Sequence, residues 1–477
     1  MVFSSIPFLF FFLPLCLILY YAVPYECFSI KSWKNMVLLV FSLAFYAWGE
    51  PVYILLMFFA TAVDYCNGRL MERFGTTRGR RKFFLVCSVA VNLSVLAFFK
   101  YADFLIATLG GIFSIPLKPL GLGLPVGISF FTFQTMSYSI DLYRKEVPME
   151  RNYLNYLTYV SMFPQLVAGP IVRYSVVNEE LRTRRIKKEE VREGLFRFMQ
   201  GLFKKVLIAN QAGALWEEIR MLEAGEASVA TAWLGAAAFT LQLYFDFSAY
   251  SDMAIGMGKM LGFHFPENFK YPLSAISVTD FWRRWHISLS TWFRDYVYIP
   301  LGGNRKGTAR HLRNMLVVWF LTGLWHGASW NFVLWGLYYG ALLALEKYVW
   351  GKALDALPKI VRHCYLLLIV VVGFVIFVFD DMGALGIYFR SMAGMAGNRL
   401  WGGECLWYLE NYMAVLLAAA VLSFPVYPWV KNRIGRMGDK GRTAASAVSM
   451  AGYILLFLVT VAFLVNDTYN PFLYFRF

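Results

Sequence analysis

Charged side chains are scarce in this sequence of 477 residues. Aspartate, glutamate, lysine and arginine together make up 16% of it, whereas about a quarter of a soluble globular protein is charged. Hydrophobic residues make up 59%. That is more apolar surface than a water-soluble particle of this size can hide, because surface grows nearly with mass. The composition excludes a soluble enzyme and a disordered chain, and it predicts an all-α polytopic membrane protein.

Cysteine is scarce too, and its spacing excludes further classes. The six cysteines are scattered, and none forms a CxxC pair, so a secreted disulfide scaffold and a metal framework are both excluded. The soluble-enzyme signatures GxGxxG, Walker A, HExxH and GxSxG are missing as well. We therefore expect no bound metal and look for chemistry among the polar residues of the apolar segments.

Acidic residues are fewer than basic ones, 30 against 45, which gives a net charge of +15. Nucleic-acid binding would explain this excess, but basic cytoplasmic loops explain it more simply in a membrane protein. We expect contacts with membrane lipids and none with nucleic acid. Both termini then face outward, because this orientation places the basic connections 69–82, 173–205 and 431–442 inside and the acidic ones, 217–226 and 380–410, outside.

The apolar runs predict 11–14 membrane segments, some of them re-entrant where glycine and proline interrupt the run. The first segment lacks the basic region and cleavage site of a signal peptide, so we expect it to be retained. The polar stretch 173–195 is typical of one amphipathic cytoplasmic helix. The expected segments lie near 4–23, 35–49, 51–68, 83–99, 101–115, 122–140, 153–171, 195–213, 228–248, 313–329, 331–349, 364–380, 411–430 and 446–466.

His326 is one of only five histidines, and it follows the apolar run 315–320. At about 1.5 Å per residue it lies about 20 Å from the basic boundary near Arg313, deep in the bilayer. Gly323 and Gly327 flank it at a spacing that lets another helix or a substrate approach the backbone. One interpretation is a buried structural histidine bonded to a carbonyl. The other is a neutral imidazole that acts as general base toward a hydroxyl.

His286 lies in the stretch 280–296, where aromatic and apolar residues alternate with arginine and aspartate. This pattern is typical of an interfacial or re-entrant helix, because tryptophan favours the headgroup level. One interpretation is an aromatic belt with Asp–Arg pairs. The other is a pocket for a phosphate-bearing or carrier-linked donor, with arginine binding the anion. The candidate donor-binding residues are Arg283, Arg284, Trp285, Asn304 and Arg305.

Three aspartates are expected to be structural polar partners. Asp246 and Asp252 lie six residues apart in an aromatic stretch, which is not a reliable same-face spacing on a helix. A buried aspartate paired with Arg283 or Arg284 is the simplest account of them. Asp295 belongs to the same class. The remaining histidines, His264, His311 and His363, lie beside polar connections and are expected to be solvated.

Three motifs give the chain a family resemblance: FWRRWH at 281–286, YIPLGGNR at 298–305 and WHG at 325–327. The two motif histidines are 40 residues apart. The pattern resembles the membrane-bound O-acyltransferase (MBOAT) family and, within it, the branch that O-acetylates bacterial polysaccharides such as alginate. The resemblance covers essentially the whole chain, with supporting stretches at 125–134 and 163–170.

The resemblance implies a catalytic role for His326, with His286 as the second signature histidine. It implies one membrane domain over 1–477, with a catalytic core over roughly 122–349 and helices around a central funnel. Family members move an acyl group from a cytoplasmic thioester donor, such as acetyl-CoA, toward a hydroxyl, without a tightly bound cofactor. Polysaccharide-modifying members pass it to an extracytoplasmic partner with an SGNH-type esterase fold. These implications place the chain in a bacterial plasma (inner) membrane, with a polysaccharide as acceptor.

Three alternatives remain open at this point. The first is D-alanyl transfer from a carrier protein to teichoic acid, as in a related branch of the family. The second is a transporter of an acylated intermediate, which would also use intramembrane histidine and aspartate. A transporter predicts inverted repeats, and the sequence shows none. The third is a scaffold for an extracellular enzyme, which would need no buried histidine.

Overall fold

The structure is a computed structural model that describes residues 1–23, 33–167, 169–223 and 225–466. No strand occurs among these residues, and helices form the regular structure, which confirms the all-α fold. The chain forms two compact units. Unit 1 comprises Met1–Phe198 and Ser251–Glu267, and unit 2 comprises Met199–Tyr250 and Asn268–Phe477. The single domain expected over 1–477 stays a prediction.

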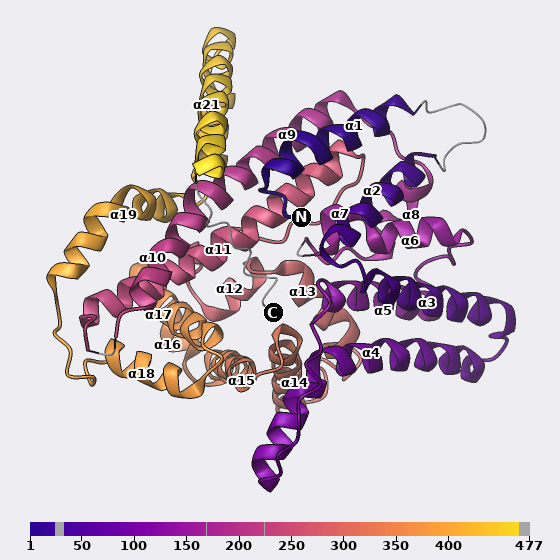
Figure 1. Cartoon of the computed structure of the whole chain (residues 1–477), viewed down its shortest axis with the longest axis horizontal. Helices are drawn as coiled ribbons and strands as arrows, with labels where there is room; N and C mark the ends of the chain where they lie inside the picture. The colour runs from indigo at the N-terminus through magenta and orange to yellow at the C-terminus, as the bar shows by residue number, and fades with distance from the viewer. Residues whose placement is uncertain (24–32, 168, 224, 467–477) are drawn as a thin grey trace. The chain divides into compact units, whose positions relative to one another are not determined.

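Unit 1 contains the N-terminal helices, among which α3, α4 and α5 lie side by side (Figure 1). Polar side chains fix where several of these helices begin. Thr77 accepts from the Arg80 amide at the start of α4, and Asn152 accepts from the Leu154 amide at the start of α6. The helices are α1 (Leu13–Ala22), α2 (Trp33–Gly49), α3 (Ile54–Phe74), α4 (Arg78–Phe113), α5 (Ile128–Arg144), α6 (Tyr153–Ser161), α7 (Phe163–Leu166) and α8 (Tyr174–Arg182).

Two sequence expectations for unit 1 were wrong. The segments expected at 83–99 and 101–115 form the single helix α4. Lys100 lies where the two expected segments were divided, but lysine does not break a helix, and its ammonium donates to Ser129 Oγ at 3.2 Å inside the unit. The single amphipathic helix expected at 173–195 is also two helices, because α8 ends at Arg182 and the next helix begins only at Lys188.

A buried carboxylate joins α3, α4 and α5. Asp64 of α3 is fully buried and accepts hydrogen bonds from Ser88 Oγ and, at 2.9 Å to each carboxylate oxygen, from Asn92 Nδ2 of α4. Ser88 Oγ lies 2.8 Å from Ser139 Oγ of α5, and Thr135 Oγ1 donates to Asn92 Oδ1. Neutral side chains thus satisfy this charge at the centre of three packed helices.

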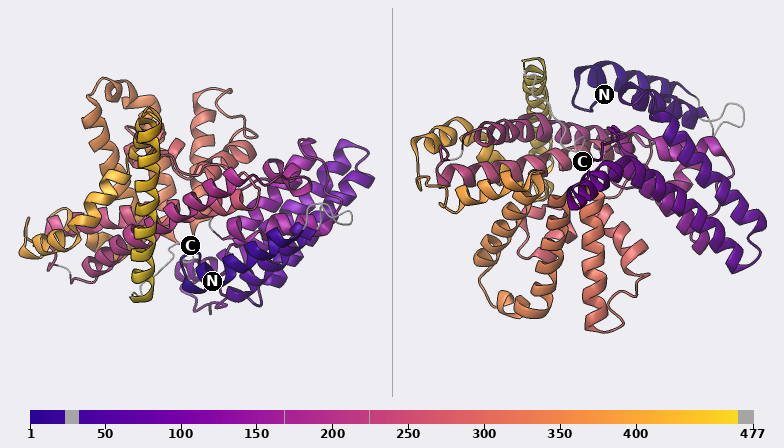
Figure 2. Two further views of the ribbon diagram at one scale, coloured as in Figure 1. Left: turned by 90° about the horizontal axis from the view of Figure 1, so that it is seen from above. Right: turned by 60° about the horizontal axis from the view of Figure 1, so that its bottom comes forward.

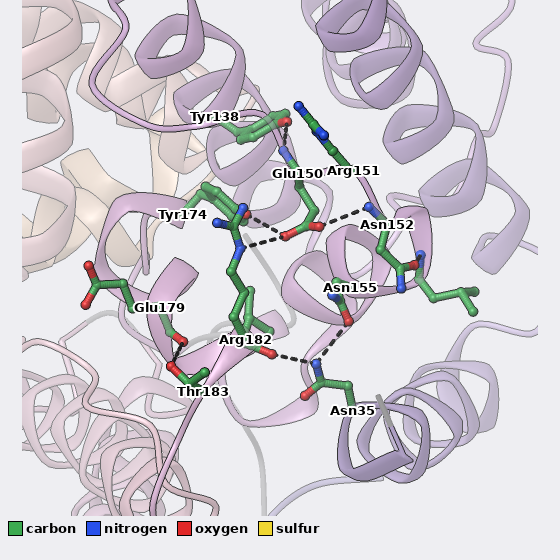
Figure 3. A network of polar contacts seen from close by, with 12 residues as sticks. Asn35, Tyr138, Glu150, Arg151, Asn152, Asn155, Tyr174, Glu179, Arg182 and Thr183 are labelled. Carbon is green, nitrogen blue, oxygen red and sulfur yellow. Dashed lines mark hydrogen bonds and ion pairs between the residues drawn. The ribbon is translucent and has the colours of Figure 1, made fainter. Parts of the chain in front are cut away.

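A second polar network surrounds Glu150, between α5 and α6 (Figure 3). The Glu150 carboxylate is buried and accepts from the Tyr174 hydroxyl at 2.8 Å, with the Arg182 guanidinium 3.7 Å away. The Glu150 amide donates to the Tyr138 hydroxyl at 3.1 Å. The network fixes the start of α6 and the end of α8 against α5, so it is a structural device of unit 1.

Unit 2 holds the C-terminal half of the chain. Helices α9 (Lys188–Phe203) and α11 (Val229–Met260) contribute residues to both units. Among the described residues, α3, α4 and the helices Lys359–Val378, Gly403–Leu422 and Asp439–Asn466 are long and apolar enough to cross a membrane. The chain is therefore a multi-pass membrane protein, and the count of 11–14 segments stays a prediction. The other helices of unit 2 are α10 (Asn210–Arg220), α12 (Val278–Arg284), α13 (Ile287–Phe293), α14 (Thr308–His326), α15 (Trp330–Leu345), α16 (Gly351–Asp355), α17 (Lys359–Val378), α18 (Met382–Met392), α19 (Gly403–Leu422), α20 (Val426–Gly435) and α21 (Asp439–Asn466).

Helices α14 and α15 are consecutive and pack side by side (Figure 1), and Figure 2 shows the chain from two further directions. Glycines let their backbones touch. A Cβ atom on Gly323 would lie 2.3 Å from the Phe332 carbonyl oxygen, and one on Gly336 would lie 2.4 Å from the Trp319 carbonyl oxygen. The close approach expected at Gly323 is confirmed, and a helix rather than a substrate occupies it. The crossing fixes the end of α14, where His326 stands.

Replacing Gly323 with alanine should destabilise unit 2. The added methyl group meets backbone atoms, which have no rotamer to change, so the two helices must separate. We expect a loss of about 1–3 kcal/mol, seen as a lower melting temperature in detergent. Gly386→Ala is the matched control, because nothing lies within 4 Å of a Cβ at that helical position. Equal melting temperatures for the two variants would contradict the close crossing.

Candidate active site

The two motif histidines line one cavity of unit 2. This cavity of about 230 Å³ lies between the segment 279–298 and the hairpin of α14 and α15. The 279–298 segment comprises most of α12, all of α13 and the π-helical turn η4 (Arg294–Tyr298). The cavity is lined by Thr279, Trp282, Arg283, His286, Leu289, Ser290, Phe293, Arg294, Tyr298, Val318, Trp319, Thr322, His326 and Leu343.

His326 is the last residue of α14 and is 5% exposed. Aromatic rings surround its imidazole: the centroids of Trp335, Trp325 and Phe377 lie 4.9, 5.0 and 5.2 Å from it. Gly327 ends the helix directly after it, and a Cβ there would meet the Phe332 ring. The imidazole is therefore buried among aromatic rings at the end of α14.

His286 stands in the turn between α12 and α13 and is 1% exposed. Its backbone has φ +46°, and Asn268 holds it there, since the Ile287 amide donates to the Asn268 carbonyl oxygen at 3.0 Å. The side-chain oxygen of Asn268 accepts from the Ser288 amide at 3.2 Å and from Ser288 Oγ at 2.9 Å, and it lies 3.2 Å from His286 Nδ1. These three groups converge on one oxygen.

That convergence fixes the histidine's tautomer. A backbone amide can only donate, so the Asn268 atom facing it is the oxygen, and His286 Nδ1 must carry a proton to bond to it. His286 Nε2 then keeps its lone pair. It is buried, and no group within the described ranges donates to it. Asn268 thus determines that Nε2 is the nitrogen of His286 that can accept a hydrogen bond in the cavity.

Arg283 differs from the neighbouring arginines because no described carboxylate forms an ion pair with it. Arg284 is paired with Asp280 at 2.9 Å, and Arg294 with Asp295 at 2.7 Å. Arg283 lines the cavity and is exposed, and in the part of the chain that the structure describes no carboxylate lies at ion-pair distance from it. The cavity thus combines two buried imidazoles with one solvent-facing guanidinium, an arrangement suited to a substrate that carries an anionic group.

Comparison with known proteins identifies the chain's family. Residues 121–384 match the membrane-bound O-acyltransferase (MBOAT) family. A Pseudomonas putida protein described as probable alginate O-acetylase AlgI is 38% identical over 496 residues, covering 100% of both chains. The chain belongs to the MBOAT family. Other similar proteins are the probable alginate O-acetylase AlgI of Pseudomonas aeruginosa, 43% identical over 82% of this chain and 75% of its own, and the peptidoglycan O-acetyltransferase of Helicobacter pylori, 33% identical over 76% and 74%.

Membership makes this MBOAT chain an O-acyltransferase, so the cavity with its two motif histidines is the candidate active site. Of the predicted site residues, the structure brings His286, His326 and Arg283 together in this cavity. Two further histidines of unit 2, His311 and His363, were expected to be solvated. His311 is buried and bonded to the Tyr348 hydroxyl rather than solvated, and His363 Nδ1 lies 3.0 Å from the Ala275 carbonyl oxygen.

Other predicted donor-binding residues of the MBOAT chain lie outside the cavity lining. Arg284 is held by Asp280, and Trp285 packs on Phe281 and Phe374 with centroids 5.4 and 5.1 Å away. Asn304 and Arg305 are exposed on the turn that leads into α14. Trp285 is thus packed against other aromatic rings. The turn that contains Asn304 and Arg305 is a basic surface near the start of α14.

The buried aspartates have cation partners that sequence reasoning did not foresee. Asp246 pairs with Lys205 at 2.7 Å in unit 2, with both side chains buried. In unit 1, Asp252 pairs with Arg197 at 2.6 Å. The pairing expected with Arg283 or Arg284 is therefore wrong, because lysine and arginine on α9 and the π-helical turn after it supply the charge. Asp295 does pair with an arginine, its neighbour Arg294.

Asn268 is a residue of the candidate site that the sequence did not indicate. It lies 18 residues before His286 in a stretch without a motif, and only the fold brings the two together. The sequence around Asn268 carries no signal for this contact, because the partner lies in another segment of the chain. Asn268 is fully buried, and a buried amide needs partners.

Proposed function

We propose that this MBOAT chain moves an acetyl group from a cytoplasmic thioester donor, such as acetyl-CoA, toward a hydroxyl on the other side of the membrane. One observation carries the proposal: His286 and His326 share a cavity with Arg283, an exposed arginine that no described carboxylate pairs with. The relatives named as alginate O-acetylase and peptidoglycan O-acetyltransferase support acetyl as the acyl group and a polysaccharide as acceptor.

His326 acts as the general base. An alcohol is a poor nucleophile at neutral pH, and a positioned base accelerates its attack by about a hundredfold to ten-thousandfold. The hydroxyl proton passes to the imidazole while the oxygen attacks the thioester carbonyl carbon. The carbon–sulfur bond then breaks, and the leaving thiolate takes the proton back from the imidazolium. No acyl-histidine forms, and the aromatic walls around His326 protect the thioester from water.

His286 and Arg283 serve the donor. The free lone pair of His286 Nε2 accepts from an amide N–H of the donor's pantetheine arm, and Arg283 binds an anionic phosphate of the same molecule. The donor enters from the cytoplasmic side, where the basic connections lie. It is a co-substrate that leaves as the free thiol after each turnover, so the reaction needs no tightly bound cofactor.

The acceptor lies outside the plasma (inner) membrane of a bacterium. It is either a hydroxyl of the polysaccharide itself or a hydroxyl of an SGNH-type acetyltransferase that passes the acetyl group on. The second route fits a polymer too large to enter a cavity of about 230 Å³, because a single serine side chain can reach where a sugar chain cannot.

Acetyl transfer by the purified protein tests the proposal. The full chain in liposomes is incubated with radiolabelled acetyl-CoA and with a small alcohol or an alginate oligomer as acceptor. Label in the acceptor supports the proposal. Transfer from an acyl-loaded carrier protein but not from acetyl-CoA would favour the D-alanyl type of reaction instead. Movement of an acylated compound into the liposomes without chemical transfer would favour a transporter.

Arg283→Ala should raise the KM for acetyl-CoA about tenfold with little change in kcat, because losing a charge-assisted hydrogen bond to phosphate costs about 1.5 kcal/mol. The measurement is initial rate against acetyl-CoA concentration. Arg433→Ala removes an equal charge from α20, where the guanidinium packs over the Trp429 ring, and it should leave KM unchanged. Equal KM values for the two variants would exclude Arg283 from the donor site.

A further inference from the structure

The buried carboxylate of Glu346, directly after the C-terminal end of α15, contacts α12, the helix that carries Arg283. Glu346 begins the π-helical turn η5 (Glu346–Trp350) directly after α15, and it is 7% exposed. Its Oε2 accepts from the Val278 amide at 2.8 Å, and its Oε1 accepts from the Thr279 amide at 3.0 Å. Both carboxylate oxygens therefore bind the first two amides of α12.

Glu346 supplies hydrogen-bond acceptors for amides at the start of α12. The helix has only seven residues, and an isolated helix of that length is unstable in water. Its first amides have no partner within the helix. Glu346 takes two of them, and Ser277 Oγ accepts from the third, that of Asp280, at 3.0 Å. A carboxylate at this end also interacts favourably with the helix dipole.

The turn that carries Glu346 is itself anchored. The hydroxyl of Tyr348, two residues further on, is bonded to His311 Nδ1 of α14. The η5 turn therefore connects the first turn of α14 with the first turn of α12. Both helices line the cavity, α14 through Thr322 and His326 and α12 through Trp282 and Arg283.

The orientation of α12 decides where Arg283 points. Thr279, whose amide Glu346 binds, lines the cavity together with Trp282 and Arg283, all on one helix. Within α12, Asp280 takes the neighbouring Arg284 as its ion-pair partner, so Arg283 is the cation that faces the cavity. A small rotation of α12 about its axis would turn Arg283 away.

We propose that Glu346 is a positioning residue for the acyl donor: its carboxylate holds the start of α12 so that Arg283 meets the donor's anionic group. The proposal rests on the function proposed above, because it takes the donor to be an acyl thioester that carries phosphate. Glu346 does not touch the reacting atoms, so its loss should weaken donor binding and leave the chemical step nearly intact.

Glu346→Gln is the variant that tests this. It keeps the side chain's size, but its NH₂ group opposes an amide that also donates, so one of the two bonds is lost. We expect the KM for acetyl-CoA to rise about fivefold to tenfold, with kcat within about twofold of wild type. Glu410→Gln, at an exposed position of α19, is the matched control and should behave as wild type.

A double-mutant cycle separates positioning from general loss of structure. If Glu346 acts through Arg283, adding Glu346→Gln to Arg283→Ala should change KM by less than about twofold. Full additivity of the two effects would overturn the proposal, and so would a fall in kcat without a change in KM. If Glu346→Gln does not fold, Ser277→Ala weakens the same helix start and should raise KM about threefold.

The two proposals fail in different ways. A wild-type protein that transfers acetyl from acetyl-CoA, together with a Glu346→Gln variant of unchanged KM, overturns the role of Glu346 and leaves the proposed function standing. A folded wild-type protein that transfers nothing from acetyl-CoA or from a loaded carrier overturns the proposed function and this inference with it.

Discussion

Replacing His326 with alanine should abolish acyl transfer while the protein stays folded and inserted. Loss of the general base lowers the rate about a hundredfold to ten-thousandfold. The other imidazole of the cavity, His286, is held by Asn268 and is assigned to the donor, so it does not replace His326. The smaller side chain leaves space at the end of α14, so some loss of stability accompanies the change. The measurement is transfer of label from acetyl-CoA at saturating donor.

The control for this variant is His264→Ala. The His264 side chain is 53% exposed in unit 1, where Nδ1 lies 2.6 Å from Glu180, and its removal should leave the rate unchanged. Melting in detergent checks that both variants fold. Transfer by the His326 variant at more than about a tenth of the wild-type rate would rule out general-base catalysis by this residue.

Replacing Asn268 with alanine should lower kcat/KM for acetyl-CoA about 10–100-fold. The change removes the oxygen on which His286 Nδ1 and both donors of Ser288 converge, and leaving such buried donors unpaired costs about 1–3 kcal/mol. The imidazole also becomes free to carry its proton on Nε2, where it can no longer accept from the donor molecule.

Asn268→Asp distinguishes this explanation from simple loss of packing. A carboxylate oxygen accepts from the same three groups, so this variant should retain more activity than the alanine variant. Asn411→Ala, at a solvent-exposed position of α19 where the amide only bonds to its own helix, should be neutral. Equal losses in the aspartate and alanine variants would show that Asn268 does not act through its acceptor oxygen.

The sequence predicted the fold class, and it singled out the two histidines that line the cavity of the candidate site. Composition alone indicated a helical membrane protein, and the scarcity of polar residues made His326 stand out. Gly323 signalled a close helix crossing that the structure contains. These features were predictable because each depends on local composition or on spacing along one helix.

The remaining features depend on contacts between distant segments. Nothing near Asp246 reveals that its partner is Lys205, 41 residues earlier, because a buried charge pairs with whatever the fold brings to it. Asn268 and Glu346 are likewise known only from what they touch. The division of α4 at residue 100 was wrong for the same reason, because the Lys100 ammonium finds its partner on Ser129 of α5 and the helix continues past it.

The buried Asp64 constrains the order in which the chain can enter its membrane. A lone carboxylate at the centre of a spanning helix costs about 2.5–3.5 kcal/mol during insertion. The groups that satisfy Asp64 are Ser88 and Asn92, which are made later, on α4. The hydroxyl that completes the network, on Ser139, arrives only with α5. We therefore expect helix α3 to gain its full stability in the bilayer only after the two helices that follow it have been made and have packed against it.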